Sequence, residues 1–260
     1  MPSLPDRDNG WAAAVALPEQ EDIEYRVVRK RARTHVVEEL LLQPVNGRLD
    51  YQPGQYALVG DIDNRVPGRA YSIANAPRPD GLISLLVTTV ADDGHPVWLA
   101  ERVLPGDRLL LSGPYGSFIA DSSAAGQPAL YLAGGSGLAP IRALLEASLA
   151  RRPVGPCTLF VSARTSTDLI DHARFRAWEA LHPAFRYLRT LTRAIEAPPA
   201  GRIPDVLRCW VPRLDDHRVY IAGGSGFVAG CAEAAVRHGA RPDRVMTEAF
   251  SAGLTRRWSA

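Results

Sequence analysis

The chain has 260 residues, 46% hydrophobic and 22% charged, the balance expected of a globular protein with buried cores. Its formal net charge of +2 gives no indication of a nucleic-acid partner or of an anionic membrane surface. No apolar stretch approaches the roughly 18–20 residues of a membrane-spanning helix, so we expect a cytoplasmic protein that does not bind membranes.

Cysteine and lysine usage excludes several kinds of site. The three cysteines, Cys157, Cys209 and Cys231, form no Cys-x-x-Cys pair and are too few for a plant-type iron–sulfur cluster. A disulfide framework is not expected either, and the six histidines show no metal-like clustering, so we predict no metal site. Lys30 is the only lysine and follows no glycine-rich turn, which excludes a P-loop NTPase.

The first half of the chain has the pattern of short strands. Residues 1–21 are rich in Pro, Asp, Glu and Ala without a period, and we interpret them as a flexible leader. One later stretch, 95–104, has helical spacing. Six β-rich runs bounded by Pro, Gly or Asp lie at 24–28, 37–43, 54–60, 70–74, 83–90 and 108–113. Together they predict an antiparallel β-barrel domain over residues 22–120.

After a predicted linker at 121–128 the pattern changes to alternating strands and helices. Strands are predicted at 129–133, 157–163, 185–191, 218–223 and 244–250, and helices at 138–150, 171–181, 203–210 and 227–239. This alternation predicts an α/β domain over 127–250, with a parallel sheet covered by helices on both faces, and a C-terminal tail at 251–260. Ligands of such sheets bind beyond the carboxyl ends of the strands.

Gly-Gly-Ser-Gly occurs at 134–137 and again at 223–226, each time after a predicted strand. Such glycines permit positive φ and close backbone approach, and a following helix attracts phosphate at its N-terminus. The first turn contains only the G-x-G of a dinucleotide-binding fingerprint, with Pro140 in place of the third glycine. Phosphate binding and an ordinary strand-to-helix turn both remain open. The spacing of the two turns indicates similar turns in one sheet rather than a repeat of domains.

Three further stretches each have an ordinary structural explanation. In Arg69-Ala70-Tyr71-Ser72, the arginine and the tyrosine fall on one face of a strand. The stretch from Gly113 to Phe118 resembles a turn that ends the barrel, and Glu248-Ala249-Phe250 a strand end.

Taken in order, these stretches resemble the ferredoxin–NADP⁺ reductase superfamily, and most of all the flavin reductase components of bacterial oxygenases. That family carries R-x-Y-S, G-P-x-G-x-F, G-G-[ST]-G-[LI]-A-P, C-G-P and E-x-[FY], and the matches here are Arg69–Ser72, Gly113–Phe118, Gly134–Pro140 and Glu248–Phe250. The resemblance covers about residues 22–250. It implies a flavin-binding barrel followed by a nucleotide-binding sheet, which is the fold that periodicity predicts, with FAD and NAD(P)H as cofactors.

The resemblance also implies roles for single residues. Tyr71 is expected against the isoalloxazine ring, Arg69 on the flavin pyrophosphate, and Ser72 at flavin N5. Glu248 and Phe250 are expected on the other side of the ring, with Phe250 making way for nicotinamide; Ser72, Tyr71, Glu248 and Phe250 are thus the candidate catalytic residues. The other candidate cofactor-binding residues are Ala70, Gly94, His95, Pro96, Val97, Gly113, Gly116, Gly134, Gly135, Ser136, Gly137, Leu138 and Pro140.

Two departures from the family pattern and one arginine pattern complete the candidate site. Val97 stands where the family has a helix-capping serine, so we expect weaker flavin retention. Ala222-Gly223-Gly224 replaces C-G-P, so we expect slower hydride transfer. Arg164 and Thr192-Arg193 end two predicted strands where NADP-using relatives carry Ser-Arg or Thr-Arg, which favours NADPH over NADH; solvated surface arginines are the alternative.

The function implied is an FAD-dependent NAD(P)H oxidoreductase that passes electrons singly to a separate ferredoxin or oxygenase. Two alternatives remain: a free-flavin or quinone reductase, and an electron-relay subunit that binds flavin without efficient nicotinamide turnover. The sequence identifies neither the acceptor nor the oligomeric state.

Overall fold

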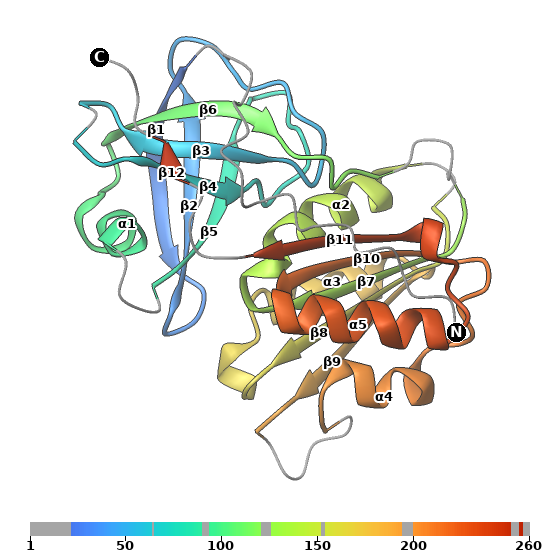
Figure 1. Ribbon diagram of the computed structural model, residues 1–260. Helices are drawn as coiled ribbons and strands as arrows, with labels where there is room; N and C mark the ends of the chain where they lie inside the picture. The colour runs from blue at the N-terminus through green and yellow to red at the C-terminus, as the bar shows by residue number, and fades with distance from the viewer. Residues whose placement is uncertain are drawn as a thin grey trace.

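The computed structural model describes residues 22–63, 65–89, 94–120, 126–151, 154–193, 200–250 and 255–256. The predicted leader at 1–21 and most of the linker and tail lie outside the described residues. The described residues form a β-barrel beside a three-layered α/β unit (Figure 1). Both predicted halves of the fold are therefore confirmed.

The barrel is an antiparallel sheet in the order β12-β4-β3-β6-β1-β2-β5. Its strands are β1 (Ile23–Ala32), β2 (Val37–Pro44), β3 (Tyr56–Asp61), β4 (Gly68–Ser72), β5 (Ile83–Thr88), β6 (Arg108–Tyr115) and β12 (Thr255–Arg256). An antiparallel bridge from Ile73 to Leu85 joins the β4 side of the sheet to β5 and closes the barrel. Alternate side chains of β1 and β2, including Tyr25, Val27 and Leu40, point inward and are fully buried, as period-2 strands around a core require.

The predicted helix at 95–104 is an α-helical turn, α1 (Gly94–Val97), that continues as a π-helical turn over Trp98–Arg102. Lys30 holds the end of this turn from β1: its ammonium donates to the carbonyls of Ala100 and Val103 and lies 3.2 Å from Glu38. The chain's only lysine is thus a cap for unpaired helix carbonyls.

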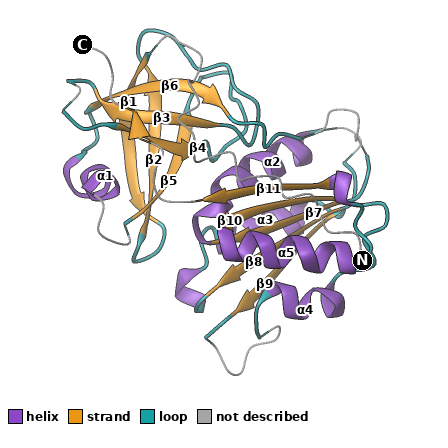
Figure 2. Cartoon of the chain, in the orientation of Figure 1, coloured by secondary structure: helices purple, strands orange, loops and turns teal. Residues whose placement is uncertain are grey.

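The α/β unit is a parallel sheet in the order β11-β10-β7-β8-β9. Its strands are β7 (Ala129–Gly134), β8 (Cys157–Ala163), β9 (Phe185–Leu191), β10 (Arg218–Gly224) and β11 (Val245–Phe250), and its helices are α2 (Leu138–Ala150), α3 (His172–Leu181), α4 (Ile203–Trp210) and α5 (Ser225–Arg237). Tyr131 and Ala133 of β7 pack in one core with α2 and α3, whereas Leu130 and Leu132 pack with α4 and α5 on the other face (Figure 2). Burial on both faces explains the continuous apolar runs of these strands.

The strand order reverses between β7 and β10, which are neighbours with Ala133 opposite Ala222. The two Gly-Gly-Ser-Gly turns therefore leave adjacent strands at the same edge of the sheet. A topological switch point of this kind is where open α/β sheets bind ligands. The turns also touch: a Cβ added to Gly137 would lie 2.1 Å from the carbonyl oxygen of Ala222.

Two residues of the predicted C-terminal tail return to the barrel. Thr255 and Arg256 form β12 and pair with Arg69 and Gly68 of β4. Among the described residues, no helix is both long enough and apolar enough to cross a lipid bilayer.

Candidate functional site

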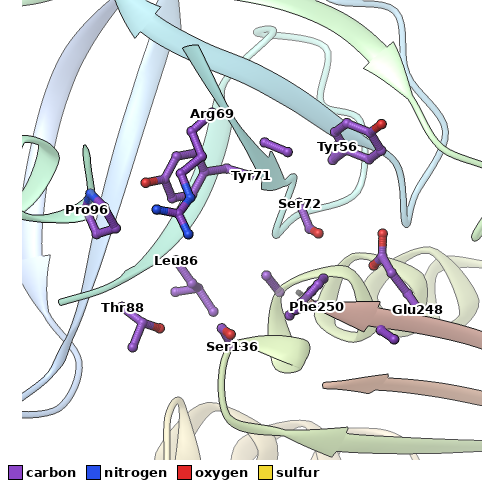
Figure 3. Close-up of a pocket in the computed structure, with 13 residues that line it drawn as sticks. Tyr56, Arg69, Tyr71, Ser72, Leu86, Thr88, Pro96, Ser136, Glu248 and Phe250 are labelled. Carbon is purple, nitrogen blue, oxygen red and sulfur yellow. The ribbon is translucent and has the colours of Figure 1, made fainter. Parts of the chain in front are cut away.

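A cavity of about 180 Å³ lies between the barrel and the carboxyl end of the parallel sheet (Figure 3). Strands β3, β4 and β5 and helix α1 form its barrel side, and β11 with the start of α2 forms the other. The lining residues are Tyr56, Arg69, Ala70, Tyr71, Ser72, Leu86, Thr88, Pro96, Ser136, Ala139, Glu248, Ala249 and Phe250. The structure thus brings together the R-x-Y-S stretch and the E-x-F stretch, which lie far apart in the sequence.

Tyr71 is held by a buried histidine. Its hydroxyl lies 3.0 Å from Nδ1 of His95, and Nε2 of His95 lies 3.0 Å from the Val59 carbonyl. Because a carbonyl only accepts, Nε2 carries the proton and Nδ1 accepts from the Tyr71 hydroxyl. The two rings pack 5.6 Å apart, and Trp98 meets the far side of His95 edge-on at 5.2 Å. His95 therefore fixes the tilt of the Tyr71 ring at the cavity wall.

Arg69 lies on β4, two residues before Tyr71, so both side chains project from the same face of the strand. Figure 3 shows its guanidinium directed into the cavity between the Tyr71 ring and Leu86. A flat aromatic ring with a planar cation beside it suits a ligand that has an aromatic ring system and a phosphate group.

Glu248 is a buried carboxyl that faces the barrel from β11. Figure 3 shows it directed toward Ser72 and Tyr56, and it is only 8% exposed. Burial raises the pKa of Glu248 to about 8, although a hydrogen bond with Ser72 partly opposes the rise. At neutral pH the group is therefore mostly protonated and can donate a hydrogen bond. Its Oε2 atom has no partner among the described residues, which is the state expected of a polar atom that a bound ligand satisfies.

A second cavity, of about 340 Å³, adjoins the first, and Thr88 and Ser136 line both. It lies where β7, β8 and β10 end. Seven of the predicted nucleotide-binding residues line it: Gly134, Gly135, Ser136, Leu138, Arg164, Thr192 and Gly224. Gly135 has a φ of +58°, and a Cβ added there or at Gly224 would meet nothing within 4 Å, so the space above both glycine turns is open.

The other predicted residues support the cavity walls rather than line them, as far as the described residues show. Gly137 and Ala222 pack against each other behind the turns, and Arg193 is exposed to solvent. In α1 the lining residue is Pro96, whereas Val97 is not among the lining residues of either cavity. A Cβ at Gly116 would lie 3.0 Å from the Tyr56 ring, so the absence of a side chain here lets the Tyr56 ring pack against the backbone. Gly94, Gly113, Pro140 and Gly223 are likewise not among the lining residues of either cavity.

The barrel also lines the second cavity, which no motif in the sequence indicated. Thr34, His35, Val36 and Val37, from the turn between β1 and β2, form one of its walls. His35 reaches across to the α/β unit, where Nδ1 lies 3.5 Å from Asp168. No glycine motif or residue pattern marks this turn, so only the packing of the two units reveals it.

The first cavity suits a flavin, because Tyr71 and Arg69 form its ring-and-cation wall and the buried Glu248 has an open hydrogen-bonding position. The second cavity suits a dinucleotide, because it opens over the glycine turns at the switch point of the sheet. The fold and these features define a two-domain oxidoreductase with a nucleotide-binding sheet. Residues 131–233 match the family model described as the oxidoreductase NAD-binding domain.

Curated relatives match most of the chain, beyond the residues that the family model covers. It is 32% identical over 237 residues to the ferredoxin–NAD(+) reductase component of the alkene monooxygenase system of Xanthobacter autotrophicus, covering 85% of this chain and 70% of that protein. It is 31% identical over 215 residues to terephthalate 1,2-dioxygenase reductase component 2 of a Comamonas species, covering 82% of this chain and 63% of the relative's length. The chain belongs to the ferredoxin–NAD(P)⁺ reductase family, and it spans 63% of the length of the terephthalate 1,2-dioxygenase reductase components that it matches.

Solved structures agree. The crystal structure of an Amycolatopsis cytochrome P450 reductase superposes with a TM-score of 0.82 at 27% identity, covering 88% of this chain and 70% of that one. A ferredoxin NADP⁺ reductase from Neisseria gonorrhoeae, with bound FAD and NADP, shares the fold with a TM-score of 0.76 at 22% identity, covering 89% and 99% of the two chains. The resemblance suggested by the ordered motifs is therefore confirmed.

Proposed function

We propose that this chain is an FAD-dependent NAD(P)H oxidoreductase that passes electrons singly to a separate ferredoxin or oxygenase component. The observation that carries the proposal is the pair of adjoining cavities: one has the features of a flavin site, the other opens over the glycine turns, and they share Thr88 and Ser136. Family membership supports it, because the relatives named above are reductase components of oxygenase systems.

FAD, when bound, would supply the chemistry that accepts a hydride from NAD(P)H and releases the two electrons one at a time. The chain's own residues bind and orient. Tyr71, held by His95, offers a flat face, and Arg69 offsets the negative charge of a pyrophosphate. Ser72 and the protonated Glu248 present hydrogen-bonding groups from opposite walls. Phe250 lies beside Glu248 and keeps water from this side of the cavity until the nicotinamide replaces its ring.

NADPH is the nucleotide that we propose, on the basis of Arg164. This residue and Thr192 line the second cavity at the ends of β8 and β9, where a guanidinium can bind a 2′-phosphate through two parallel hydrogen bonds. Arg193, which the sequence also indicated, is not among the lining residues of either cavity and is a weaker candidate. The acceptor and the oligomeric state are open, and the cytoplasmic location stays a prediction.

Anaerobic reduction tests the proposal directly. Purified protein loaded with FAD should be yellow, should lose its yellow colour when NADPH is added, and should then reduce a ferredoxin or a one-electron dye. A yellow protein that keeps its colour with NADPH and NADH would support the electron-relay alternative. A protein that cannot bind added FAD would overturn both.

A further inference from the structure

A buried arginine joins the α/β unit to the barrel. Arg142 lies one turn into α2 and is 1% exposed, and three of the four groups that its guanidinium contacts belong to the barrel. Nη2 donates to Glu39 Oε1 at 2.9 Å and to Ser84 Oγ at 2.6 Å, and Nε donates to the Ala74 carbonyl. The fourth contact, from Nη1, is to Asp171 Oδ2 at 2.5 Å, immediately before α3.

Further charges extend this contact into a network that crosses the boundary in both directions. Arg33 of the barrel pairs with Glu39 and lies 3.4 Å from Asp171 of the α/β unit. Arg174 donates to Asp171 at 3.2 Å. The backbone N–H of Ala76, in the barrel, donates to Glu146 of α2 at 2.9 Å.

The network lies within an apolar boundary. Val37, Leu86 and Phe118 of the barrel pack in one core with Leu138 and Ile141 of α2. In surroundings of low polarity, each of these charges is costly unless its partners stay in place, so the network favours the arrangement seen here and penalises others. Apolar contacts alone would let the barrel and the α/β unit slide against each other, whereas the buried charges oppose such a displacement.

The network also lies directly behind the proposed reaction site. Ser84 shares one face of β5 with Leu86 and Thr88, which line the first cavity. Arg142 follows Ala139, another lining residue, by three positions on α2, and is therefore its neighbour on the helix surface. The same guanidinium therefore fixes the spacing of the two elements that face each other across the cavity.

We propose that Arg142 is a positioning residue that sets the separation between the flavin cavity and the nucleotide cavity. This inference rests on the proposed function, because only a reaction between groups held by the two units requires a fixed separation. Displacing reacting groups by about 1 Å can slow an enzyme about a hundredfold. Arg142 lines neither cavity, but residues of both units line each one, so its loss should slow the reaction by more than it weakens the binding of either cofactor.

Two variants and a matched control test the inference. Arg142→Met removes the charge, and Arg142→Lys keeps it without the planar fork, so one can be studied if the other does not fold. Arg176→Met is the control, because Arg176 lies on α3 and its side chain, 60% exposed, pairs with Glu179. FAD content, the dissociation constant of NADP⁺ and the rate of flavin reduction at saturating NADPH are measured for each folded variant.

A second measurement does not depend on activity. Cys209 is exposed on the α/β unit, and Leu104, 58% exposed on the barrel, can be replaced by cysteine. Spin labels at the two positions report the distribution of distances between the units. We expect both Arg142 variants to broaden this distribution and to lower the reduction rate about tenfold or more, with any loss of FAD content or NADP⁺ affinity smaller than the loss of rate, whereas Arg176→Met matches the parent protein.

An unchanged distance distribution in the Arg142 variants would overturn the inference, and so would a broadened one with an unchanged reduction rate. Failure of the proposed function looks different: the parent protein itself would not be reduced by NADPH or NADH, and the distance distribution would still show whether Arg142 fixes the two units.

Discussion

Replacing Gly137 by alanine tests the contact between the two glycine turns. Gly137 has φ −58° and ψ −14°, angles that alanine adopts without strain. On backbone entropy alone, the change would stabilise the protein by about 0.4–1 kcal/mol. A Cβ at this position, however, would lie 2.1 Å from the carbonyl oxygen of Ala222 and 2.5 Å from the nitrogen of Gly223. These are backbone atoms of β10, a strand paired on both sides, and they cannot rotate away as a side chain could.

The size of the effect follows from the overlap. Ordinary van der Waals contact begins at 3.4 Å, whereas the added Cβ would lie 2.1 Å from the Ala222 oxygen. The first turn and the end of β10 must therefore move apart by about 1.3 Å, the difference between these two distances. Overpacking of this kind costs about 1–3 kcal/mol and more where the obstacle is rigid. We expect Gly137→Ala to lower the free energy of unfolding by about 3 kcal/mol and the Tm by roughly 6–12 °C. NADPH affinity should fall as well, because the same turn lines the second cavity.

The second turn offers a matched control. Gly224 has φ −62° and ψ 152°, and a Cβ there meets nothing within 4 Å. Gly224→Ala should leave the unfolding free energy unchanged or raise it by up to about 1 kcal/mol. Thermal unfolding followed by circular dichroism measures both variants. Tm values for the two variants that agree within about 2 °C would refute the argument from overlap.

Other predictions concern the cavity walls. Burial raises the pKa of Glu248 to about 8 from 4.5, so the FAD-free folded protein holds a proton that the unfolded chain releases; its stability should fall as the pH rises from about 5 to 8. Glu248→Gln should remove this fall in urea-unfolding midpoints, and parallel curves for the two proteins would contradict a buried acid. Phe250→Ala should change NADPH affinity in fluorescence titrations while leaving FAD content intact; unaltered affinity would refute its gating role. Arg164→Ala should raise the KM for NADPH about tenfold and leave that for NADH within twofold, with a smaller effect from Arg193→Ala. Equal losses with both nucleotides would remove the basis for preferring NADPH.

The fold was predictable from the sequence because its elements have clear periods. Strand β1 of the barrel alternates between buried and exposed residues, the central strands β7 and β10 of the parallel sheet are nearly continuously apolar, and most elements are separated by Gly, Pro or Asp. Both walls of the first cavity were also predictable, because Arg69–Ser72 and Glu248–Phe250 are local motifs whose order along the chain resembles a known family.

What the sequence could not predict depends on which distant residues meet. Arg142 and Glu39 are 103 positions apart, and neither belongs to a motif, so nothing local marks them as partners. His35 lines the nucleotide cavity only because the β1–β2 turn packs beside β8. The choice between Pro96 and Val97, or between Arg164 and Arg193, depends on side-chain direction at the end of an element, where periodicity gives no information.

The pairing of β12 with β4 has a mechanical consequence. The chain leaves the barrel for the sheet after Tyr115, and it returns when Phe250 of β11 is followed, after residues 251–254, by Thr255 opposite Arg69. This return joins β11, which carries Glu248 and Phe250, to the strand beside Arg69, so the two walls of the first cavity are linked along the chain as well as across the boundary between the units.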